Sequence, residues 1–247
     1  MVLKERAWEL FDQLNDYWVE IVDARFTERE IDLIRTMGEQ DLVLDLCCGT
    51  GRHSILLTGQ GWDMVGLDMS ANLLRKARHS MDENKIRFPL VRGDMRQLPF
   101  KSKVFSAVVN MFTSFGYLPS EEEDMKCLEE ITRVLRQDGL FLLDVVNKNH
   151  LVHTFRKRDW GEFRSFYLLE ERNLNDSAQL LWSRWVLLDK KGSEIGVFDH
   201  YLRLYSFLEL KAMLCKAGMN VLDVYGGYEG QPFEQNASRM IVLAGKV

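Results

Sequence analysis

The order of short apolar runs and helix-like segments between residues 42 and 146 is the feature that most constrains the fold. Helix-like segments begin near Arg52, Ser70 and Ser120, and each lies between two apolar runs of strand length. The runs are LVLDL, DMVGLD, IRFPLVR, VFSAVVN and LFLLDVV. Strands that alternate with helices form βαβ units, whose parallel strands build a sheet with helices on both faces. The sequence therefore predicts a doubly wound α/β domain.

The pattern changes after Val146. From about Phe163 to Tyr205 the chain is rich in Leu, Trp, Tyr and Val, with turn signals at NLNDS and DKKGS, which predicts three antiparallel strands. A helical segment, SFLELKAMLCKAG, and two strands, NVLDVY and RMIVLAG, follow. We therefore expect a core made of residues 1–150 and 206–247 with an N-terminal helical lid. A β-rich substrate-binding insertion, residues 151–205, interrupts it.

Three segments have the spacing of a capping box, in which Ser or Thr caps a helix and Glu three residues later reaches back to it. They are Thr27–Glu30, Ser120–Glu123 and Ser206–Glu209. Each predicts the start of a helix.

Composition narrows the range of partners. The 247 residues carry a net charge of −5, and no basic run exceeds RKR at residues 156–158. Proteins that bind nucleic acid through many phosphates normally show a basic stripe, so a small-molecule substrate is favoured. The N-terminal segment MVLKERAWELFDQL is charged and amphipathic, unlike a signal peptide, and no run approaches the ~20 apolar residues that cross a bilayer. We expect a cytoplasmic monomer or homodimer without a membrane segment.

The loop LVLDLCCGTGRHS (residues 42–54) is open to several interpretations. Cys47 and Cys48 lack the spacing and the neighbouring ligands of a metal site, so we expect packed thiols and no metal. Gly49 and Gly51 allow a sharp turn and close approach of a ligand. A dinucleotide-binding loop needs a third glycine where this chain has Ser54. The loop alone does not distinguish nucleotide cofactors.

Two carboxylates at later strand ends narrow the choice. Asp68 follows Gly51 by 17 residues and ends the second predicted strand, where it can accept hydrogen bonds from both hydroxyls of an adenosine ribose. Asp94 lies at another strand end on the same sheet edge, where ligands of open α/β sheets bind. It can accept from an adenine amino group while the amide of Met95 donates to a ring nitrogen. The alternative for Asp94 is an ordinary turn residue.

Taken in order, these motifs resemble the class I S-adenosylmethionine-dependent methyltransferases. The segments that carry the resemblance are VLDLCCGTGRHS, VGLDMS, GDMRQLPF, FSAVVNMFTSFGYL and RVLRQDGLFLLDVVN. It covers residues from about Asp41 to Val146 and implies a Rossmann-like, seven-stranded, mostly parallel sheet with an antiparallel last strand. One departure is LRQDGL, where the family usually has L-K-P-G-G. That turn supports the sheet and does not touch the cofactor.

The resemblance implies roles for residues around S-adenosylmethionine. The methionine part would be surrounded by Asp45, Gly49, Gly51 and Asn110. The adenosine part would be held by Asp68 at the ribose, by Met69 against the adenine, and by Asp94 and Met95 at the adenine edge.

Two residues outside these motifs are candidates for catalysis. Tyr17 lies in the N-terminal segment FDQLNDYWVEI and could close over the cofactor, as an aromatic residue does in related enzymes. The alternative is a helix that packs Trp8, Phe11 and Trp18 onto the domain. His53 follows the glycine loop; it either accepts a proton from the acceptor or only forms a hydrogen bond near a helix start.

The candidates for substrate contact are aromatic or cationic. They are Phe115, Tyr117, Arg203, Tyr205, Tyr228 and Arg239. Phe115 and Tyr117, with Phe112, either wall the pocket or belong to the core. VFDHYLRLY alternates, so His200 and Leu202 are expected in the sheet core. On the other face of this strand, Arg203 and Tyr205 either bind an anionic substrate or are exposed to solvent. Arg239 is a second anion-binding candidate.

The predicted function is methyl transfer from S-adenosylmethionine to a nitrogen or oxygen of a small molecule by in-line displacement. The arrangement also resembles N-methyltransferases of nucleotide-linked amino sugars and a group of bacterial methyltransferases with unassigned substrates. The N-P-P-Y signature of nucleic-acid amino methylation is absent, because Met111, Phe112 and Thr113 follow Asn110. Two alternatives remain open: a non-catalytic S-adenosylmethionine-binding subunit that activates a partner, and a nicotinamide-dependent reductase, which Ser54 disfavours.

Overall fold

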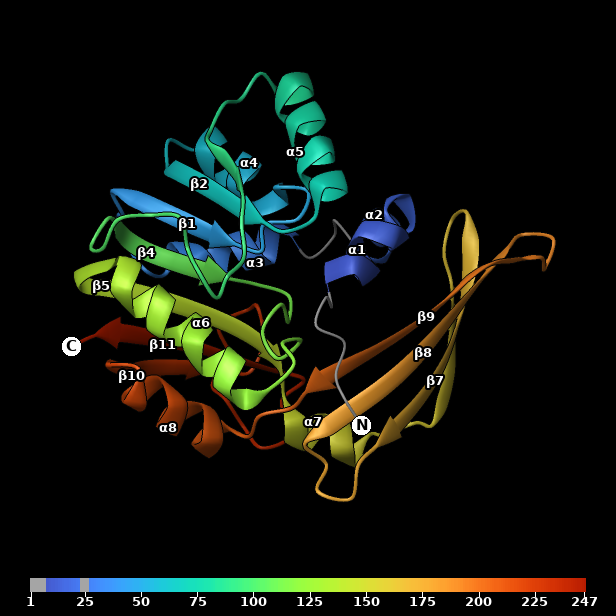
Figure 1. Ribbon diagram of the computed structural model, residues 1–247. Coiled ribbons are helices and arrows are strands. Elements are labelled where there is room, and N and C mark those ends of the chain that lie inside the picture. Colours follow the sequence, from blue (N-terminus) through green and yellow to red (C-terminus); the bar gives the residue numbers. More distant parts are fainter. Residues whose placement is uncertain (1–7, 23–26) are drawn as a thin grey trace.

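The computed structural model describes residues 8–22 and 27–247, which form two β-sheets and the helices that cover them (Figure 1). The large sheet has seven strands in the order β10-β11-β5-β4-β1-β2-β3. In that order their bounds are Met219–Tyr225, Arg239–Lys246, Leu135–Val146, Phe105–Asn110, Leu42–Leu46, Asp63–Asp68 and Leu90–Arg92. Strand β11 runs antiparallel to both of its neighbours, and the other pairs are parallel. The predicted doubly wound sheet with an antiparallel last strand is confirmed.

Two apolar layers cover the faces of this sheet. Helices α6 (Glu121–Val134) and α8 (Phe207–Lys216) bury Leu128, Leu214 and their neighbours in one layer. Helices α3 (Thr27–Arg35), α4 (Arg52–Gly59) and α5 (Ala71–Asn84) lie on the other face, where Ile34, Leu57 and Met81 join a second layer. The carboxyl ends of the parallel strands lie between these layers.

The helix starts follow the sequence signals closely. Helix α4 begins at Arg52, and Ser70 and Ser120 cap α5 and α6 through hydrogen bonds to their side-chain oxygens. Among the predicted boxes whose caps the structure describes, Ser206 and Glu209 complete one, at the start of α8. In α6, Glu123 instead pairs with Arg96 and Lys126. The Glu30 side chain likewise bonds to other residues, as described below.

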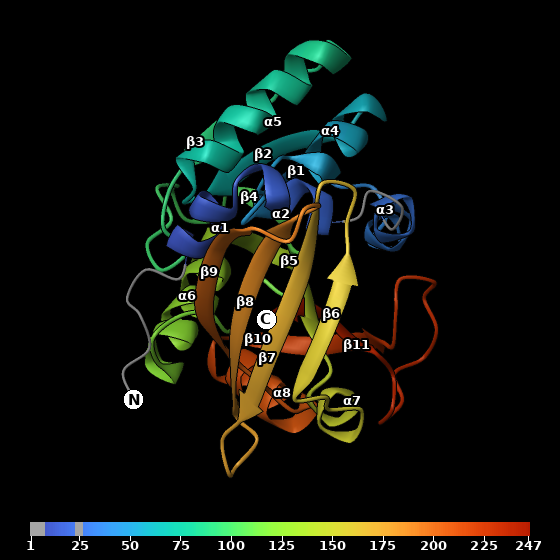
Figure 2. The ribbon, with the colours of Figure 1, turned by 90° about the vertical axis from the view of Figure 1, so that its right-hand side faces the viewer.

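The second sheet contains four strands, one more than predicted, in the order β6-β7-β8-β9. They are Arg158–Glu162, Phe166–Leu174, Leu180–Asp189 and Glu194–Arg203, and they follow the short helix α7 (Lys148–His153). All pairs are antiparallel. The extra strand, β6, has the sequence RDWGE, which lacks an apolar alternation and is recognisable only from its pairing with β7. In Figure 2 the four strands lie side by side in front of the core.

The ends of this insertion are close together. Val146, the last residue of β5, pairs with Arg239 of β11. Lys148, at the start of α7, forms an ion pair with Glu209 in the first turn of α8, with 3.5 Å between Nζ and Oε2. The chain therefore leaves the core and returns to it at neighbouring points.

Helices α1 (Trp8–Leu14) and α2 (Asp16–Ile21) lie between the two sheets (Figure 1). Leu10 and Leu14 pack with Phe166 and Leu187 of the second sheet. On the core side, the Asp12 carboxylate accepts hydrogen bonds from the Ser70 hydroxyl and the Asn72 amide. Residues 1–7 of the predicted lid lie outside the described residues. No helix within the described part of the chain is long and apolar enough to cross a membrane.

Candidate active site

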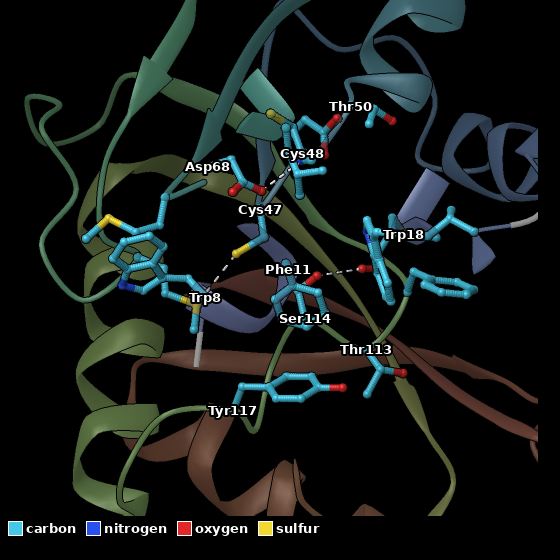
Figure 3. Close-up of a pocket in the computed structure, with 18 of the residues that line it drawn as sticks. Trp8, Phe11, Trp18, Cys47, Cys48, Thr50, Asp68, Thr113, Ser114 and Tyr117 are labelled. Carbon is cyan, nitrogen blue, oxygen red and sulfur yellow. Dashed lines mark hydrogen bonds between the residues drawn. The ribbon is translucent and has the colours of Figure 1, made fainter. Parts of the chain in front are cut away.

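A pocket opens at the carboxyl ends of β1, β2, β3 and β4, and residues of the N-terminal helices also line it (Figure 3). Its floor includes the glycine loop, Asp68 and the segment after β4, while α1 and α2 contribute Trp8, Phe11 and Trp18. Nine of the residues predicted from the sequence line it. They are Asp45, Gly49, His53, Asp68, Met69, Asp94, Met95, Phe112 and Tyr117. The fold thus gathers motifs from four strand ends at one edge of the sheet.

The glycine loop turns through left-handed conformations. Cys47, Gly49 and Gly51 have φ angles of 61°, 56° and 72°. The Gly49 amide donates a hydrogen bond of 2.8 Å to Oδ2 of Asp68. A Cβ at Gly51 would lie only 3.3 Å from the Ala77 Cβ, so glycine is required there both for its φ angle and for its size. Gly51 itself lies behind the pocket lining.

Asp68 is held by two backbone amides, those of Gly49 and Ser70, each at 2.8 Å. The residue is 9% exposed and faces the pocket. Burial raises the pKa of its carboxyl group to about 6, and the two amide hydrogen bonds moderate that rise. A carboxylate so oriented keeps free lone pairs for hydroxyl groups of a ligand.

Asp45 and Asn110 are buried at the ends of β1 and β4. The Ser54 hydroxyl donates a hydrogen bond of 2.6 Å to Asp45, so the residue that replaces the third glycine supports the neighbouring carboxylate. Asn110 donates from Nδ2 to the Leu46 carbonyl, while its Oδ1 is buried and has no partner. Asn110 lies outside the pocket lining.

Asp94 is paired with a neighbouring cation. Arg96 donates to both oxygens of the Asp94 carboxylate, at 2.6–3.1 Å, and also binds Glu123. Burial would raise the pKa of the Asp94 carboxyl, but the hydrogen bonds from Arg96 hold it below its usual range. The Arg96 pair fixes the carboxylate at the pocket wall beside Met95.

Both cysteines of the loop line the pocket. Cys48 is buried, and burial raises the pKa of both thiols well above the usual range. The Cys47 Sγ lies 3.7 Å from the Met95 Sδ. No group of His, Cys, Asp or Glu side chains among the described residues could hold a metal ion. These thiols therefore contribute shape to the pocket.

His53 forms a buried pair with Glu30. The His53 Nε2 lies 2.8 Å from Oε2 of Glu30, and Arg52 donates to the same oxygen. Glu30 is completely buried, and its Oε1 has no partner. Burial alone would raise the pKa of Glu30, but the hydrogen bonds from His53 and Arg52 lower it to about 2. Glu30 is thus a buried carboxylate that fixes the orientation of a pocket histidine.

The segment after β4 has an unusual backbone. Phe112 and Thr113 both have left-handed φ angles, 58° and 56°, although neither is glycine. Asp144, fully buried in β5, accepts a hydrogen bond of 2.8 Å from the Phe112 amide. It also accepts from Tyr228 and pairs with Arg239, whose Nη2 donates to the Thr113 hydroxyl. These contacts stabilise a strained pocket wall.

The remaining candidates lie outside the lining. Arg239 and Tyr228 are engaged with Asp144 as described. Arg203 and Tyr205 both bind Asp124, which is completely buried in α6, at 2.6 and 2.7 Å. The two arginines thus offer no unpaired cation to an anionic substrate, and Arg203 and Tyr205 do not form an exposed polar face. Phe115 packs against Tyr205 in the core.

Tyr17 packs on Phe166 of the second sheet, with 5.2 Å between ring centroids. The aromatic residues of the N-terminal helices that line the pocket are instead Trp8, Phe11 and Trp18, and Figure 3 shows Trp8 and Trp18 on opposite sides of it. The role of Tyr17 at the cofactor stays a prediction. Sequence reasoning missed Glu30 and Asp144, whose partners lie 23 and up to 95 positions away.

Comparison with known proteins bears on this pocket directly. Residues 43–139, which carry the glycine loop, Asp68, Asp94 and Asn110, match the family described as methyltransferase domain.

The chain contains a class I S-adenosylmethionine-dependent methyltransferase domain.

Relatives extend the likeness beyond that region. The cypemycin N-terminal methyltransferase of a Streptomyces species is 28% identical over 81% of this methyltransferase and 81% of the relative. The dTDP-3-amino-3,4,6-trideoxy-alpha-D-glucopyranose N,N-dimethyltransferase of Streptomyces venezuelae is 34% identical over 46% of each chain. The CcbJ methyltransferase of Streptomyces caelestis has the same fold, with a TM-score of 0.82 at 20% identity over 92% of this chain and 98% of that one.

The cofactor of the methyltransferase is S-adenosylmethionine. The residues present fit this molecule. Asp68 presents a buried acceptor for ribose hydroxyls, and Gly49 has no side chain to block an approaching ligand. Asn110, at the end of β4, has a buried oxygen without a hydrogen-bond partner. The aromatic rings of α1 and α2 lie over the same pocket, where they suit a sulfonium cation.

Proposed function

We propose that this methyltransferase transfers a methyl group to a nitrogen or oxygen atom of a small-molecule acceptor. The observation that carries the proposal is the buried His53–Glu30 pair, which borders the same pocket as the glycine loop and Asp68. An acceptor nitrogen or oxygen must lose a proton in the reaction, and a positioned histidine is the most common side chain for that task.

S-adenosylmethionine supplies a methyl group that is already activated. The chain must therefore hold the two reactants in line, exclude water and accept a proton. Correct orientation alone can contribute ~7–11 kcal/mol to lowering the barrier. We assign the adenosine part to Asp68, Met69, Asp94 and Met95, and the methionine part to Asp45, Gly49, Gly51 and Asn110.

His53 is assigned as the proton acceptor. Its Nε2 is directed to the ionised Glu30, so a proton on Nε2 leaves Nδ1 as the basic atom. Glu30 also stabilises the imidazolium that forms after proton transfer. Phe112, Thr113 and Tyr117 wall the space beside His53 and exclude water from an acceptor there.

The names of two relatives support nitrogen as the acceptor atom. One is an N-terminal methyltransferase and the other an N,N-dimethyltransferase of an amino sugar. Both are under 35% identical, so they support the class of atom and not the acceptor molecule.

The experiment is a screen of metabolite extracts with the purified chain and S-adenosylmethionine. We expect one acceptor to gain the mass of one methyl group while S-adenosylhomocysteine forms in equal amount. His53→Asn should lower kcat by ~10²–10⁴ and leave S-adenosylhomocysteine affinity unchanged. Binding of S-adenosylhomocysteine without turnover on any extract would instead support a non-catalytic subunit. Tighter binding of NADH than of S-adenosylhomocysteine would support a reductase.

A further inference from the structure

The face of the second sheet that is turned to the core carries a polar belt. We define this belt as Glu170, Arg172, Ser183 and His200. Arg172, Ser183 and His200 are direct neighbours across strands β7, β8 and β9. Apolar clusters lie on either side of the belt along the strands, with Phe166, Leu168 and Leu187 in one and Leu174, Leu181 and Leu202 in the other. A polar stripe between two apolar clusters is unexpected in a purely structural seam.

Three atoms of the belt are buried without a hydrogen-bond partner. They are Oγ of Ser183, Nδ1 of His200 and Nε of Arg172, whose one close polar contact is an ion pair with Oε2 of Glu170 at 3.5 Å without hydrogen-bond geometry. Ser183 is 1% exposed and His200 is 8% exposed. A buried polar group without a partner destabilises the fold, and native proteins contain few of them. Three in a single cross-strand row make the belt a candidate site for a ligand.

One side chain, that of Tyr117, contacts both the belt and the methyltransferase pocket. Tyr117 lines the pocket, and its ring centroid lies 6.2 Å from that of His200 and 5.4 Å from that of Phe11. The His200 ring in turn contacts Trp185, with 4.6 Å between centroids. Tyr117 therefore stands between the pocket and the belt. A molecule that reached from His53 to His200 would have to pass the Tyr117 ring.

The charges of the belt determine what kind of group fits. Arg172 lies 3.5 Å from Glu170 and 3.4 Å from Asp159, so its charge is already balanced. His200 is neutral, because burial lowers its pKa to about 4. Arg172 has two carboxylate neighbours, and Asp159 pairs in addition with Arg156 at 3.9 Å, so the belt offers an anion no unpaired cation. The Nε of Arg172 can only donate a hydrogen bond, so a pure donor such as an ammonium group cannot satisfy it.

We propose that Arg172, Ser183 and His200 form a subsite for the part of the acceptor molecule that lies farthest from the methylated atom. That part carries an uncharged group, such as a hydroxyl, that both accepts and donates hydrogen bonds. The inference rests on the proposed function, since it names the class of acceptor for the same site. The group accepts from Arg172 Nε and exchanges hydrogen bonds with the Ser183 hydroxyl and His200 Nδ1. Glu170, already bound by the Trp185 indole, keeps the Arg172 guanidinium in place.

The test uses three amines of equal carbon number as probes on the full chain saturated with S-adenosylhomocysteine. They are 2-amino-1,3-propanediol, isopropylamine and serine, which carry two hydroxyls, none, and one hydroxyl with a carboxylate. Binding is followed through the ¹⁵N signals of the His200 ring, identified by their loss in His200→Gln. We expect the diol to shift these signals and to bind about tenfold more tightly than isopropylamine, the effect of one to two hydrogen bonds. In Ser183→Ala that ratio should fall to about one.

Several results would overturn the inference: equal binding of the diol and isopropylamine, tighter binding of serine than of the diol, or His200 signals that no probe moves. The titration needs no turnover. A failure of the proposed function, seen as absent methylation in the extract screen, is therefore distinguishable from a failure of the subsite.

A second measurement needs no ligand. Ser183→Ala removes a hydroxyl that has no partner, so the midpoint of thermal unfolding should stay the same or rise. Ser106→Ala is the matched control, because its hydroxyl bonds to both the amide and the carbonyl of Leu42. That control should lose about 2–4 °C. A fall for Ser183→Ala as large as for Ser106→Ala would show a structural partner and refute the subsite.

Discussion

At the scale of single residues, the pocket depends on carboxylates that the backbone orients. Asp68 uses two lone pairs for the amides of Gly49 and Ser70 and turns the others to the pocket. The sequence was sufficient to find it, because a carboxylate at a strand end beside a glycine loop is a local pattern. Glu30 could not be found in this way. Its spacing from Thr27 indicated a helix cap, and only the fold brings it to His53.

We predict that Asp68→Ala weakens the binding of S-adenosylhomocysteine about 10- to 150-fold. The ribose hydroxyls lose a charged acceptor worth ~1.5–3 kcal/mol. Isothermal titration calorimetry measures this change. Asp63→Ala is the control, since Asp63 is exposed at the opposite end of the same strand, and it should leave the affinity unchanged. Equal affinities of both variants would place the ribose elsewhere.

The raised pKa of Asp68 predicts a pH dependence of cofactor binding. Its carboxyl has a pKa of about 6, so it is ionised at pH 7.5 and mostly protonated at pH 5. Protonation removes the charged acceptor, and affinity for S-adenosylhomocysteine should therefore fall as the pH is lowered through about 6. Calorimetry between pH 5 and 8 measures the profile. Asp68→Asn should flatten it, and a wild-type profile without a step near pH 6 would argue against this titration.

Glu30→Gln should lower kcat by ~10²-fold or more with little change in cofactor affinity. The amide keeps the shape of the side chain but no longer stabilises the positive charge that His53 gains. Retained affinity for S-adenosylhomocysteine together with a lowered kcat separates this role from a loss of structure. An unchanged kcat, with the protein folded, would remove His53 and Glu30 from the mechanism.

At the scale of helices and strands, prediction was most successful where the signal is local. Ser70, Ser120 and Ser206 marked helix starts correctly, since a cap needs only the next three residues. Strand β6 was missed because its residues gain their conformation from pairing with β7. The left-handed pair Phe112–Thr113 was equally hidden, since Asp144 and Arg239 impose that conformation from distant strands.

The end of α5 offers a test of backbone strain in one element. Lys85 closes this helix with φ 55°, a conformation that costs a non-glycine residue energy. Lys85 is exposed, so Lys85→Gly removes little packing. We expect it to raise the free energy of unfolding by ~0.5–1 kcal/mol, measured by urea denaturation. The change Arg78→Gly, inside the helix and also exposed, should lower the free energy of unfolding by a similar amount.

At the scale of the whole molecule, one buried ion pair joins the insertion to the core. Arg203, the last residue of β9, binds Asp124 of α6 and the carbonyls of Leu118 and Pro119. Arg203→Met leaves Asp124 buried without its cation, which typically costs ~3–5 kcal/mol. We expect a loss of that size in urea denaturation. In contrast, Arg184→Met breaks an exposed pair with Asp199 and should change stability by less than ~1 kcal/mol.

The insertion leaves the core and returns to it at neighbouring points, which the Lys148–Glu209 pair holds together. This arrangement affects how such proteins can diversify. A segment anchored at two adjacent points can be replaced by another with similarly spaced ends while the surrounding domain keeps its topology. The pocket residues that precede the insertion would be retained in such an exchange. Recombination at these two points is therefore a route by which the core exchanges its second sheet in a single genetic step.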